Sequence, residues 1–512
     1  MNQYDLIIIG AGHNGLTAAA YAGKAGKKVL VLEKSRTIGG LCRRDEFAPG
    51  FTASGVLQDT SALRPWVVKD LDLMSHGLKL RNEEVPVFLP EKNGRGILLW
   101  REAQKMSEEL AGAPAKDLAS YKDYRSFLTR IAPFIKKVFD GFPPDLIKMS
   151  FPGLWDMGLT AVSLRMMGKE DMMEVLRIGP MCSADFLNEF FESELLKAGL
   201  ALPSVISTYQ GPWSPGSNAN LLLAECLAQN PIEGGASELI AALEKACLSH
   251  GVEIKTSCEV EQIVVEGQRV VGVTVAGEHI NASKVAAACD PKTLFFDLMP
   301  RNSLSLKFEK YIGNWRCRGT TAKIDLALSA YPEFACRPGL QVEYARIGDT
   351  LDYLEKAFDS VKYGEFSQRP ALDLYFPTVE NAKLAPSGQH VLSVLVSFAP
   401  YDLKQGWNED SKSKLYENVM QVLQEHLPNL ESLVVGKKIS SPQDIESEYG
   451  TTEGHLHHGE HAADQLLVRP TPETSRYQTP FEGLYMCGAG SHPGGGVTCA
   501  PGAFSSRVIL GH

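Results

Sequence analysis

The residues that most constrain this chain are three glycines spaced G-x-G-x-x-G directly after an apolar run. The run, Leu6 to Ile9, predicts a buried parallel strand, and Gly10, Gly12 and Gly15 follow it. In this setting the first glycine permits a tight turn and the second lets a pyrophosphate approach the backbone. The third lets the following helix pack close to the strand. We therefore expect a strand–turn–helix unit that binds a dinucleotide near residue 10.

The residues after this turn complete the dinucleotide pattern. A helix is expected over about residues 14–23, and its N-terminal N–H groups and positive dipole end would face the phosphates. A second apolar strand, Val29 to Leu32, ends at Glu33, whose carboxylate can accept hydrogen bonds from both ribose hydroxyls. This acid favours a free 2′-hydroxyl, as in FAD or NAD.

A second glycine pair lies just beyond the acid. Lys34 is followed by Gly39, Gly40 and then Arg43. The chain can pass the pyrophosphate again here, with the arginine neutralising it. An ordinary turn explains the same residues, and the residue types alone leave both interpretations open.

The C-terminal end favours FAD over NAD. An apolar strand at 484–487 runs into a glycine-rich stretch that contains Gly488, Gly495 and Gly496. Successive glycines let backbone N–H groups face a flat ring at contact distance. A helix is expected to begin near Val497 and to point its positive end at that ring, which suits the negative charge of a reduced flavin.

A third segment fits the same domain. A helix is expected over 237–250, strands over 252–256, 260–266 and 270–276, and a buried run over 285–289. Val260 is placed where a strand crosses under the adenine and can offer it backbone groups. The predicted fold class is α/β, with a Rossmann-like domain made of a parallel sheet and a β-meander.

These blocks together resemble the phytoene desaturase-type FAD-dependent oxidoreductases. Within that family the chain is most similar to the subgroup of pyridine nucleotide-disulfide oxidoreductase domain-containing protein 2 and its bacterial relatives. Further matching blocks are Gly50–Thr52, Leu63–Pro65, Phe190–Ser193, Pro215–Gly216, Gly234–Gly235, His458–Glu460, Arg469–Pro470 and His492–Gly502. The resemblance implies hydride transfer to FAD from an apolar, polyene or lipid-like substrate, in carotenoid or lipid metabolism. The alternative is an FAD-binding regulatory or interaction protein with vestigial catalysis.

The FAD segments divide the chain into two discontinuous domains of the two-dinucleotide-binding-domain flavoprotein type. Residues 1–85, 230–295 and 478–512 are assigned to the FAD-binding domain. Residues 86–229 and 296–477 are assigned to an α+β substrate domain. An NAD-only dehydrogenase would explain the first glycine loop but not the C-terminal glycine-rich block.

Methionine concentrates in a predicted helical region at 146–182. This region holds more than half of the 13 methionines, namely Met149, Met157, Met166, Met167, Met172, Met173 and Met181. Methionine is soft and adaptable, which suits an apolar ligand channel or a lipid surface. Such helices pack in a core more often, and core packing is the expectation here.

Histidines gather in one short segment and recur in the C-terminal turn. The segment contains His455, His457, His458, Glu460 and His461. It matches the zinc-protease spacing H-x-x-E-H, but that motif needs a helix, which Gly454 and Gly459 disfavour. We expect a loop near the flavin ring or the substrate entrance, without metal. His492 is a weak catalytic candidate near the ring, and a structural hydrogen bond is the preferred interpretation.

Charge and cysteine content limit the partners. The net charge of −10 gives no electrostatic footprint for nucleic acid. The ten cysteines are scattered without a C-x-x-C motif, which favours a reducing compartment over a disulfide framework. An apolar strand already starts near residue 4, so no signal or transit peptide is expected. We expect a cytoplasmic protein that binds an apolar small molecule and contacts membranes peripherally, and the oligomeric state stays open.

Overall fold

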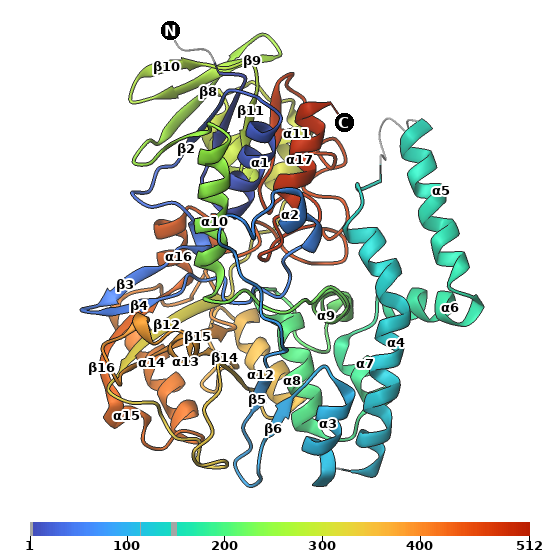
Figure 1. Ribbon diagram of the computed structural model, residues 1–512, viewed down its shortest axis with the longest axis vertical. Helices are drawn as coiled ribbons and strands as arrows, with labels where there is room; N and C mark the ends of the chain where they lie inside the picture. The colour runs from blue at the N-terminus through green and yellow to red at the C-terminus, as the bar shows by residue number, and fades with distance from the viewer. Residues whose placement is uncertain (1–3, 113, 145–150, 512) are drawn as a thin grey trace.

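A computed structural model describes residues 4–112, 114–144 and 151–511. Its first sheet is parallel and joins strands from distant parts of the chain, in the order β17-β11-β1-β2-β7. These strands are β1 (Leu6–Ile9), β2 (Val29–Leu32), β7 (Glu253–Lys255), β11 (Val285–Ala287) and β17 (Leu484–Met486). Beside the sheet, α1 (His13–Lys24) packs against α17 (Ala500–Leu510), so the two ends of the chain meet in one domain (Figure 1).

A three-stranded meander completes this domain. It consists of β8 (Val260–Glu266), β9 (Arg269–Val275) and β10 (Glu278–Asn281), paired antiparallel in the order β10-β9-β8. The helix α10 (Ala236–Ser249) packs against α1 on one face of the parallel sheet. The predicted α/β fold, a parallel sheet with a β-meander, is confirmed.

The second sheet has seven strands in the order β16-β12-β15-β14-β13-β5-β6. They are β5 (Val87–Leu89), β6 (Ile97–Leu99), β12 (Thr321–Leu328), β13 (Tyr344–Ile347), β14 (Leu372–Tyr375), β15 (His390–Ser397) and β16 (Val434–Ser440). The pairing is antiparallel except between β13 and β5, which run parallel. This mixed sheet and its helices form the lower half of the molecule in Figure 1.

Both faces of this second sheet are buried. On β12, Ala322, Ile324 and Leu326 lie in an apolar core that also contains Leu415 and Val419 of α14 (Glu409–Gln424). The alternate residues of β12 include Thr321, Lys323 and Asp325, and they are buried as well. A strand that alternates in this way usually turns its polar residues to solvent, whereas here they face the interior.

Helices cover the rest of the second domain. They are α3 (Ala103–Glu109), α4 (Ala115–Phe139), α7 (Ser183–Phe190), α8 (Glu194–Val205), α9 (Ser217–Cys226), α12 (Leu351–Lys362), α13 (Pro377–Glu380), α15 (Leu430–Leu433) and α16 (Pro442–Tyr449). Two further helices, α2 (Pro65–Asp70) and α11 (Leu306–Gly313), pack into the apolar cores of the first domain. Among the helices of the described residues, none is long and apolar enough to span a bilayer.

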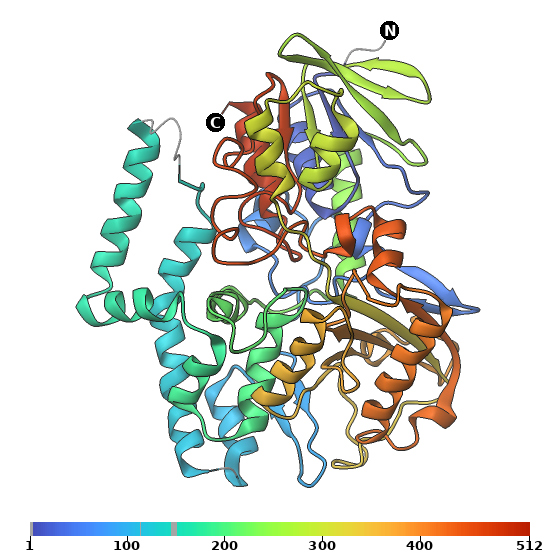
Figure 2. The same cartoon turned by 180° about the vertical axis from the view of Figure 1, so that it is seen from behind.

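The methionine-rich region does not pack as expected. It forms α5 (Phe151–Met166) and α6 (Lys169–Ile178), and α5 stands beside α4 at the edge of the molecule (Figures 1 and 2). Trp155 is 61% exposed and Met166 is 81% exposed. The expectation of core packing is therefore wrong for α5, because most of its described side chains are exposed. Met149 lies outside the described residues.

The C-terminal helix begins later than predicted. It was expected near Val497, but α17 begins at Ala500. Cys499 before it has a φ of 60°, a left-handed conformation that cannot be part of a right-handed helix. The glycine-rich turn therefore extends through Cys499, and α17 begins against α1.

Candidate functional site

A cavity of about 1110 Å³ lies at the carboxyl ends of β1 and β2. Predicted residues from all three sequence segments line it, namely Gly10, Gly12, Gly15, Glu33, Lys34, Gly40, Arg43, Val260 and Gly496. The crevice beyond the carboxyl ends of parallel strands is where nucleotides bind in open α/β sheets. The fold thus brings the N-terminal loop, the meander and the C-terminal turn to one cavity, which we call the flavin cavity after the cofactor expected from the sequence.

Four other predicted residues do not line this cavity. Gly39 forms a backbone bridge with Gly12, and a Cβ on Gly488 would lie 2.4 Å from the carbonyl oxygen of Ala288. Val497 is fully buried in the apolar core of the first domain. Gly495 lines a second cavity, described below. These residues shape the walls of the first cavity from behind.

The glycine loop is shaped for a ligand that approaches its backbone. A Cβ added to Gly12 would meet no protein atom within 4 Å, although Gly12 lines the cavity. A Cβ on Gly15 would lie 2.1 Å from the carbonyl oxygen of Gly10, so here the strand and the helix themselves need the space. Asn14 is buried, and its Oδ1 has no hydrogen-bond partner among the described residues. The open space and the unpaired polar atom fit a bound dinucleotide.

Glu33 holds the glycine loop in place. The backbone N–H of Ala11 donates to its Oε2 at 2.7 Å, and that of Ser35 donates to its Oε1 at 2.9 Å. A carboxylate has about four lone-pair sites, so it can still accept hydrogen bonds from ribose hydroxyls. Glu33 therefore orders the loop and remains available to the nucleotide.

We expect Glu33→Gln to weaken FAD binding roughly 10- to 100-fold. A glutamine amide keeps one acceptor oxygen and loses the charge, so it cannot hold both backbone N–H groups and the ribose. Fluorescence titration of flavin-stripped protein with FAD measures the effect. Glu266→Gln, on an exposed part of β8, is the control and should bind FAD like the wild type. Equal affinities for the two variants would contradict this role of Glu33.

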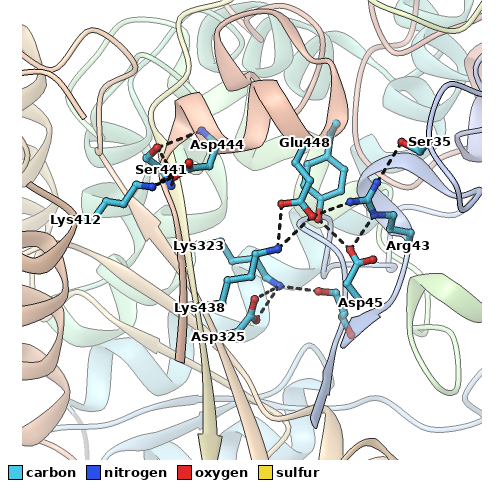
Figure 3. Close-up of polar contacts among 12 residues, drawn as sticks. Ser35, Arg43, Asp45, Lys323, Asp325, Lys412, Lys438, Ser441, Asp444 and Glu448 are labelled. Atoms are coloured by element: carbon cyan, nitrogen blue, oxygen red, sulfur yellow. Dashed lines mark hydrogen bonds and ion pairs between the residues drawn. The ribbon is translucent and has the colours of Figure 1, made fainter. Parts of the chain in front are cut away.

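Arg43 connects the cavity to the second domain. Its guanidinium pairs with Asp45 at 2.8 Å and with Glu448 of α16 at 2.7 Å, and it stacks over the ring of Tyr449 (Figure 3). Glu448 also pairs with Lys438 of β16 at 3.0 Å. Arg43 was predicted to neutralise the diphosphate. In the structure its guanidinium already pairs with two carboxylates, those of Asp45 and Glu448.

A buried ion pair lies beside this junction. Lys323 and Asp325 on β12 are 5% and 4% exposed, and their charged atoms are 2.8 Å apart. Lys323 also donates to the carbonyl oxygen of Ser54 at 2.6 Å, and the hydroxyl of Ser393 donates to Asp325 at 2.5 Å. Ser54 follows β4 (Phe51–Ala53), which pairs with β3 (Asp45–Ala48). The pair therefore fastens the second sheet to the segment that leads from the flavin cavity (Figure 3).

Replacing Lys323 by methionine is expected to lower the free energy of unfolding by about 3 kcal/mol, because Asp325 is left buried without its cation. The double variant Lys323→Met/Asp325→Leu replaces the whole pair with apolar groups and should recover most of the loss. Urea unfolding of both variants gives the comparison. A single variant as stable as the wild type would refute this account of the pair.

A second cavity of about 680 Å³ adjoins the glycine-rich turn on the side of the second domain. Its apolar wall consists of Phe139, Ile206, Leu223 and Leu227, and Pro493 and Gly495 bring the turn to it. We call this the apolar cavity. Arg64, Asn220, His457 and His461 add polar groups to its lining.

The histidine segment separates the two cavities. His458 lines the flavin cavity, whereas His457 and His461 line the apolar cavity. The rings of His457 and His461 stack with centroids 4.4 Å apart, and the N–H of Gly495 donates to Nε2 of His461 at 3.1 Å. No α-helix forms here, and the described residues contain no group of three side chains that could hold a metal ion.

Burial keeps the imidazoles of His457 and His461 uncharged at neutral pH. Burial and the nearby Arg469 lower the pKa of His457 to about 3, and burial also lowers the pKa of His461 well below its ordinary value. Arg469 is fully buried and donates to the carbonyl oxygens of Glu460, Gln465 and Gly459. It supports the loop from behind, while Glu460 pairs outward with Arg316 and Arg318.

His492 lies outside the lining of both cavities. It is buried before a cis-proline, and its ring stacks on Phe139 at 6.0 Å between centroids.

Sequence reasoning missed the apolar residues that line the apolar cavity, and it missed Asn220. Leu223 and Asn220 lie on α9, and Ile206 follows α8. In the sequence their helical spacing indicates packing between helices and gives no sign of a cavity. Arg64 belonged to a matching sequence block but carried no predicted role.

The family model of flavin containing amine oxidoreductases matches residues 15–506. This chain belongs to the flavin containing amine oxidoreductase family. It is 32% identical to pyridine nucleotide-disulfide oxidoreductase domain-containing protein 2 of Rattus norvegicus over 543 residues, which cover 99% of this chain and 93% of the rat protein. The predicted resemblance is confirmed, and this family member is an FAD-dependent oxidoreductase.

More distant relatives extend the comparison. A limonene dehydrogenase component of Castellaniella defragrans is 24% identical, over 99% of this chain and 95% of that protein. Chloroplastic prolycopene isomerase of Daucus carota is 25% identical, over 100% of this chain and 80% of that protein. Among solved structures, an oxidoreductase from Methanosarcina mazei superposes with a TM-score of 0.64 at 18% identity, covering 100% of both chains. A putrescine oxidase superposes with a TM-score of 0.58 at 14% identity, covering 99% of this chain and 98% of that one. These two structures show the fold alone.

Proposed function

We propose that this FAD-dependent oxidoreductase transfers a hydride from an apolar, polyene- or lipid-like substrate. The observation that carries the proposal is the apolar cavity, whose wall of Phe139, Ile206, Leu223 and Leu227 adjoins the turn that contains Gly495. A substrate carbon chain in this cavity would lie next to the loop that reaches the flavin cavity through Gly496. Relatives named for limonene, prolycopene and diapophytoene support the same class of substrate.

Bound FAD would supply the two-electron oxidation by accepting a hydride. The residues of the chain orient the substrate and exclude water. Gly10, Gly12 and Glu33 would hold the diphosphate and the ribose, and the turn at Gly495 and Gly496 would lie along the ring. The neutral imidazoles of His457 and His461 add no charge to the cavity wall, which suits an apolar substrate.

Separate anaerobic mixing of the FAD-loaded protein with limonene, a C30 or C40 polyene, a retinoid, a quinone and putrescine tests the proposal. Loss of the oxidised-flavin absorbance with a hydrocarbon substrate, but not with putrescine, is the expected result. Bleaching by putrescine alone would contradict it. If no hydrocarbon, retinoid or quinone changed the flavin spectrum, the vestigial FAD-binding protein would replace this proposal.

A pair of variants locates the substrate. Leu223→Gln places a polar amide in the wall of the apolar cavity and should slow flavin reduction at least about tenfold, since an apolar contact is replaced by an amide that needs a partner. Leu248 is exposed on α10, and Leu248→Gln is the matched control with unchanged reduction. Equal rates for the two variants would place the substrate elsewhere.

A further inference from the structure

A third cavity, of about 900 Å³, lies beside the apolar cavity and carries charged side chains in its lining. Pro203 and Ala224 line both cavities, so the two spaces are neighbours at α8 and α9. Its charged and amide side chains are those of Gln58, Asp59, Glu84, Arg101, Glu225, Arg346 and Asp373. We call it the polar chamber.

The floor of the polar chamber is the buried polar face of the second sheet. Arg346 of β13 lies directly opposite Asp373 of β14, and Tyr344 lies opposite Tyr375. Nε of Arg346 is 3.4 Å from Oδ1 of Asp373. Because side chains alternate across a strand, the neighbouring Ala345 and Leu374 point to the apolar core on the other face. The sheet thus presents charged groups to an interior space.

Gln58 is the strongest sign of a ligand in the polar chamber. Its side chain is 4% exposed, and neither its amide oxygen nor its amide nitrogen has a hydrogen-bond partner among the described residues. A buried polar group without a partner is costly, so such groups are nearly always paired with protein, water or ligand. Gln58 lines the polar chamber, and the preceding residue, Leu57, lines the flavin cavity, so the wall that carries Gln58 is shared with the cofactor site.

The charges of the polar chamber select the kind of group that can enter. Its lining among the described residues includes the carboxylates of Asp59, Glu84, Glu225 and Asp373, against the guanidiniums of Arg101 and Arg346. Both guanidiniums already face a carboxylate, Arg101 with Glu84 and Arg346 with Asp373. Burial raises the pKa of Asp373 to about 6 even beside Arg346. Glu225 is likewise paired, with Arg125 outside the chamber lining. An anionic head group would find no unpaired guanidinium in the described lining, whereas a hydrogen-bond donor would find the unpaired amide oxygen of Gln58.

We propose that the polar chamber binds the hydrogen-bond-donating, non-anionic head group of an elongated amphipathic substrate, with Gln58 as a specificity-determining residue. The carbon chain of this substrate would lie in the apolar cavity, toward the flavin. A hydroxyl or a protonated amine has the required chemistry, and a hydroxyl also accepts from the Gln58 amide. The proposal rests on the proposed function for the reacting end and adds the chemistry of the far end.

The test compares four ligands of equal chain length with the FAD-loaded protein. Decane, 1-decanol, decylamine and decanoate are titrated, and binding is measured calorimetrically without turnover. We expect decanol or decylamine to bind about tenfold more tightly than decane and decanoate, which is the contribution of one or two buried hydrogen bonds. Preference for decanol alone would identify a hydroxyl head, and preference for decylamine alone an ammonium head.

Gln58→Leu should abolish this preference and leave the binding of decane unchanged. Because leucine removes an unpaired buried amide, we also expect the ligand-free variant to be at least as stable as the wild type. Gln229→Leu, a half-buried position outside the chamber lining, is the control and should keep the preference.

Equal binding of decane and decanol, tightest binding of decanoate, or no binding of any of the four would overturn the polar chamber as a head-group site. A preference that survives in Gln58→Leu would overturn the role of Gln58. Failure of the proposed function appears differently, as an unchanged flavin spectrum with every substrate, because binding is measured here without flavin reduction.

Discussion

Lowering the pH from 7.5 to 5.0 is expected to reduce the free energy of unfolding by at least about 5 kcal/mol. Burial lowers the pKa of His13 and of His492 to about 4, and burial together with Arg469 lowers that of His457 to about 3. In the unfolded chain these imidazoles take up protons as the pH falls through about 6.5. The folded chain does not, so stability present above pH 6.5 is lost below it.

The size of this effect follows from proton linkage. One pKa unit corresponds to about 1.4 kcal/mol, so each of the three histidines contributes a loss of about 2 kcal/mol at pH 5.0. Asp373 acts in the opposite direction, because burial raises its pKa to about 6, and it returns about 1 kcal/mol. His455 and His461, whose pKa values burial also lowers, add to the loss.

Urea unfolding at several pH values, with FAD in fixed excess, measures this dependence. His492→Gln keeps a polar group of similar size but no titrating imidazole, and it should reduce the loss by about 2 kcal/mol. A free energy of unfolding that stays constant between pH 7.5 and 5.0 would show that the buried histidines titrate normally.

Gly15→Ala is expected to give a protein without bound FAD, whereas Gly12→Ala is expected to fold and to bind FAD at least about tenfold more weakly. A Cβ on Gly15 would lie 2.1 Å from the carbonyl oxygen of Gly10 and 3.1 Å from the Cβ of Ala288. Backbone atoms cannot move aside as a flexible side chain can, so α1 must separate from β1 and the phosphate loop is lost.

Gly12 distinguishes a ligand effect from a folding effect. Its added Cβ would meet no protein atom within 4 Å, so the protein without FAD should tolerate the methyl group while the bound cofactor should not. Thermal unfolding with and without FAD, together with the flavin content after purification, compares the two variants. Gly313→Ala, also free of contacts, is the control. A Gly15→Ala protein that keeps its FAD would contradict the account of this loop.

The flavin half of the site could be predicted because local sequence determines it. The G-x-G-x-x-G turn needs backbone conformations and close approaches that favour glycine. The strands on either side of it are apolar runs typical of a buried parallel sheet, and the second of them ends at Glu33. These segments lie far apart in the sequence, yet each carries its own signal. The start of α17 was missed because the left-handed conformation of Cys499 depends on tertiary packing.

The substrate half of the site could not be predicted in the same way. Thr321, Lys323 and Asp325 alternate with apolar residues, a pattern typical of a sheet with one solvated face, and only the covering elements show that this face is buried. Leu223 and Ile206 look like ordinary core residues at helical spacing. Likewise, the apolar composition of α5 indicates a buried helix, whereas Trp155 and Met166 on it are exposed.

The central claim is that both ends of the chain bind one FAD. The flavin content of the purified wild-type protein tests this claim most directly. The account predicts a yellow protein with about one FAD per chain, released on denaturation and taken up again by the stripped protein. A colourless protein that binds no FAD when it is offered in excess would contradict the account.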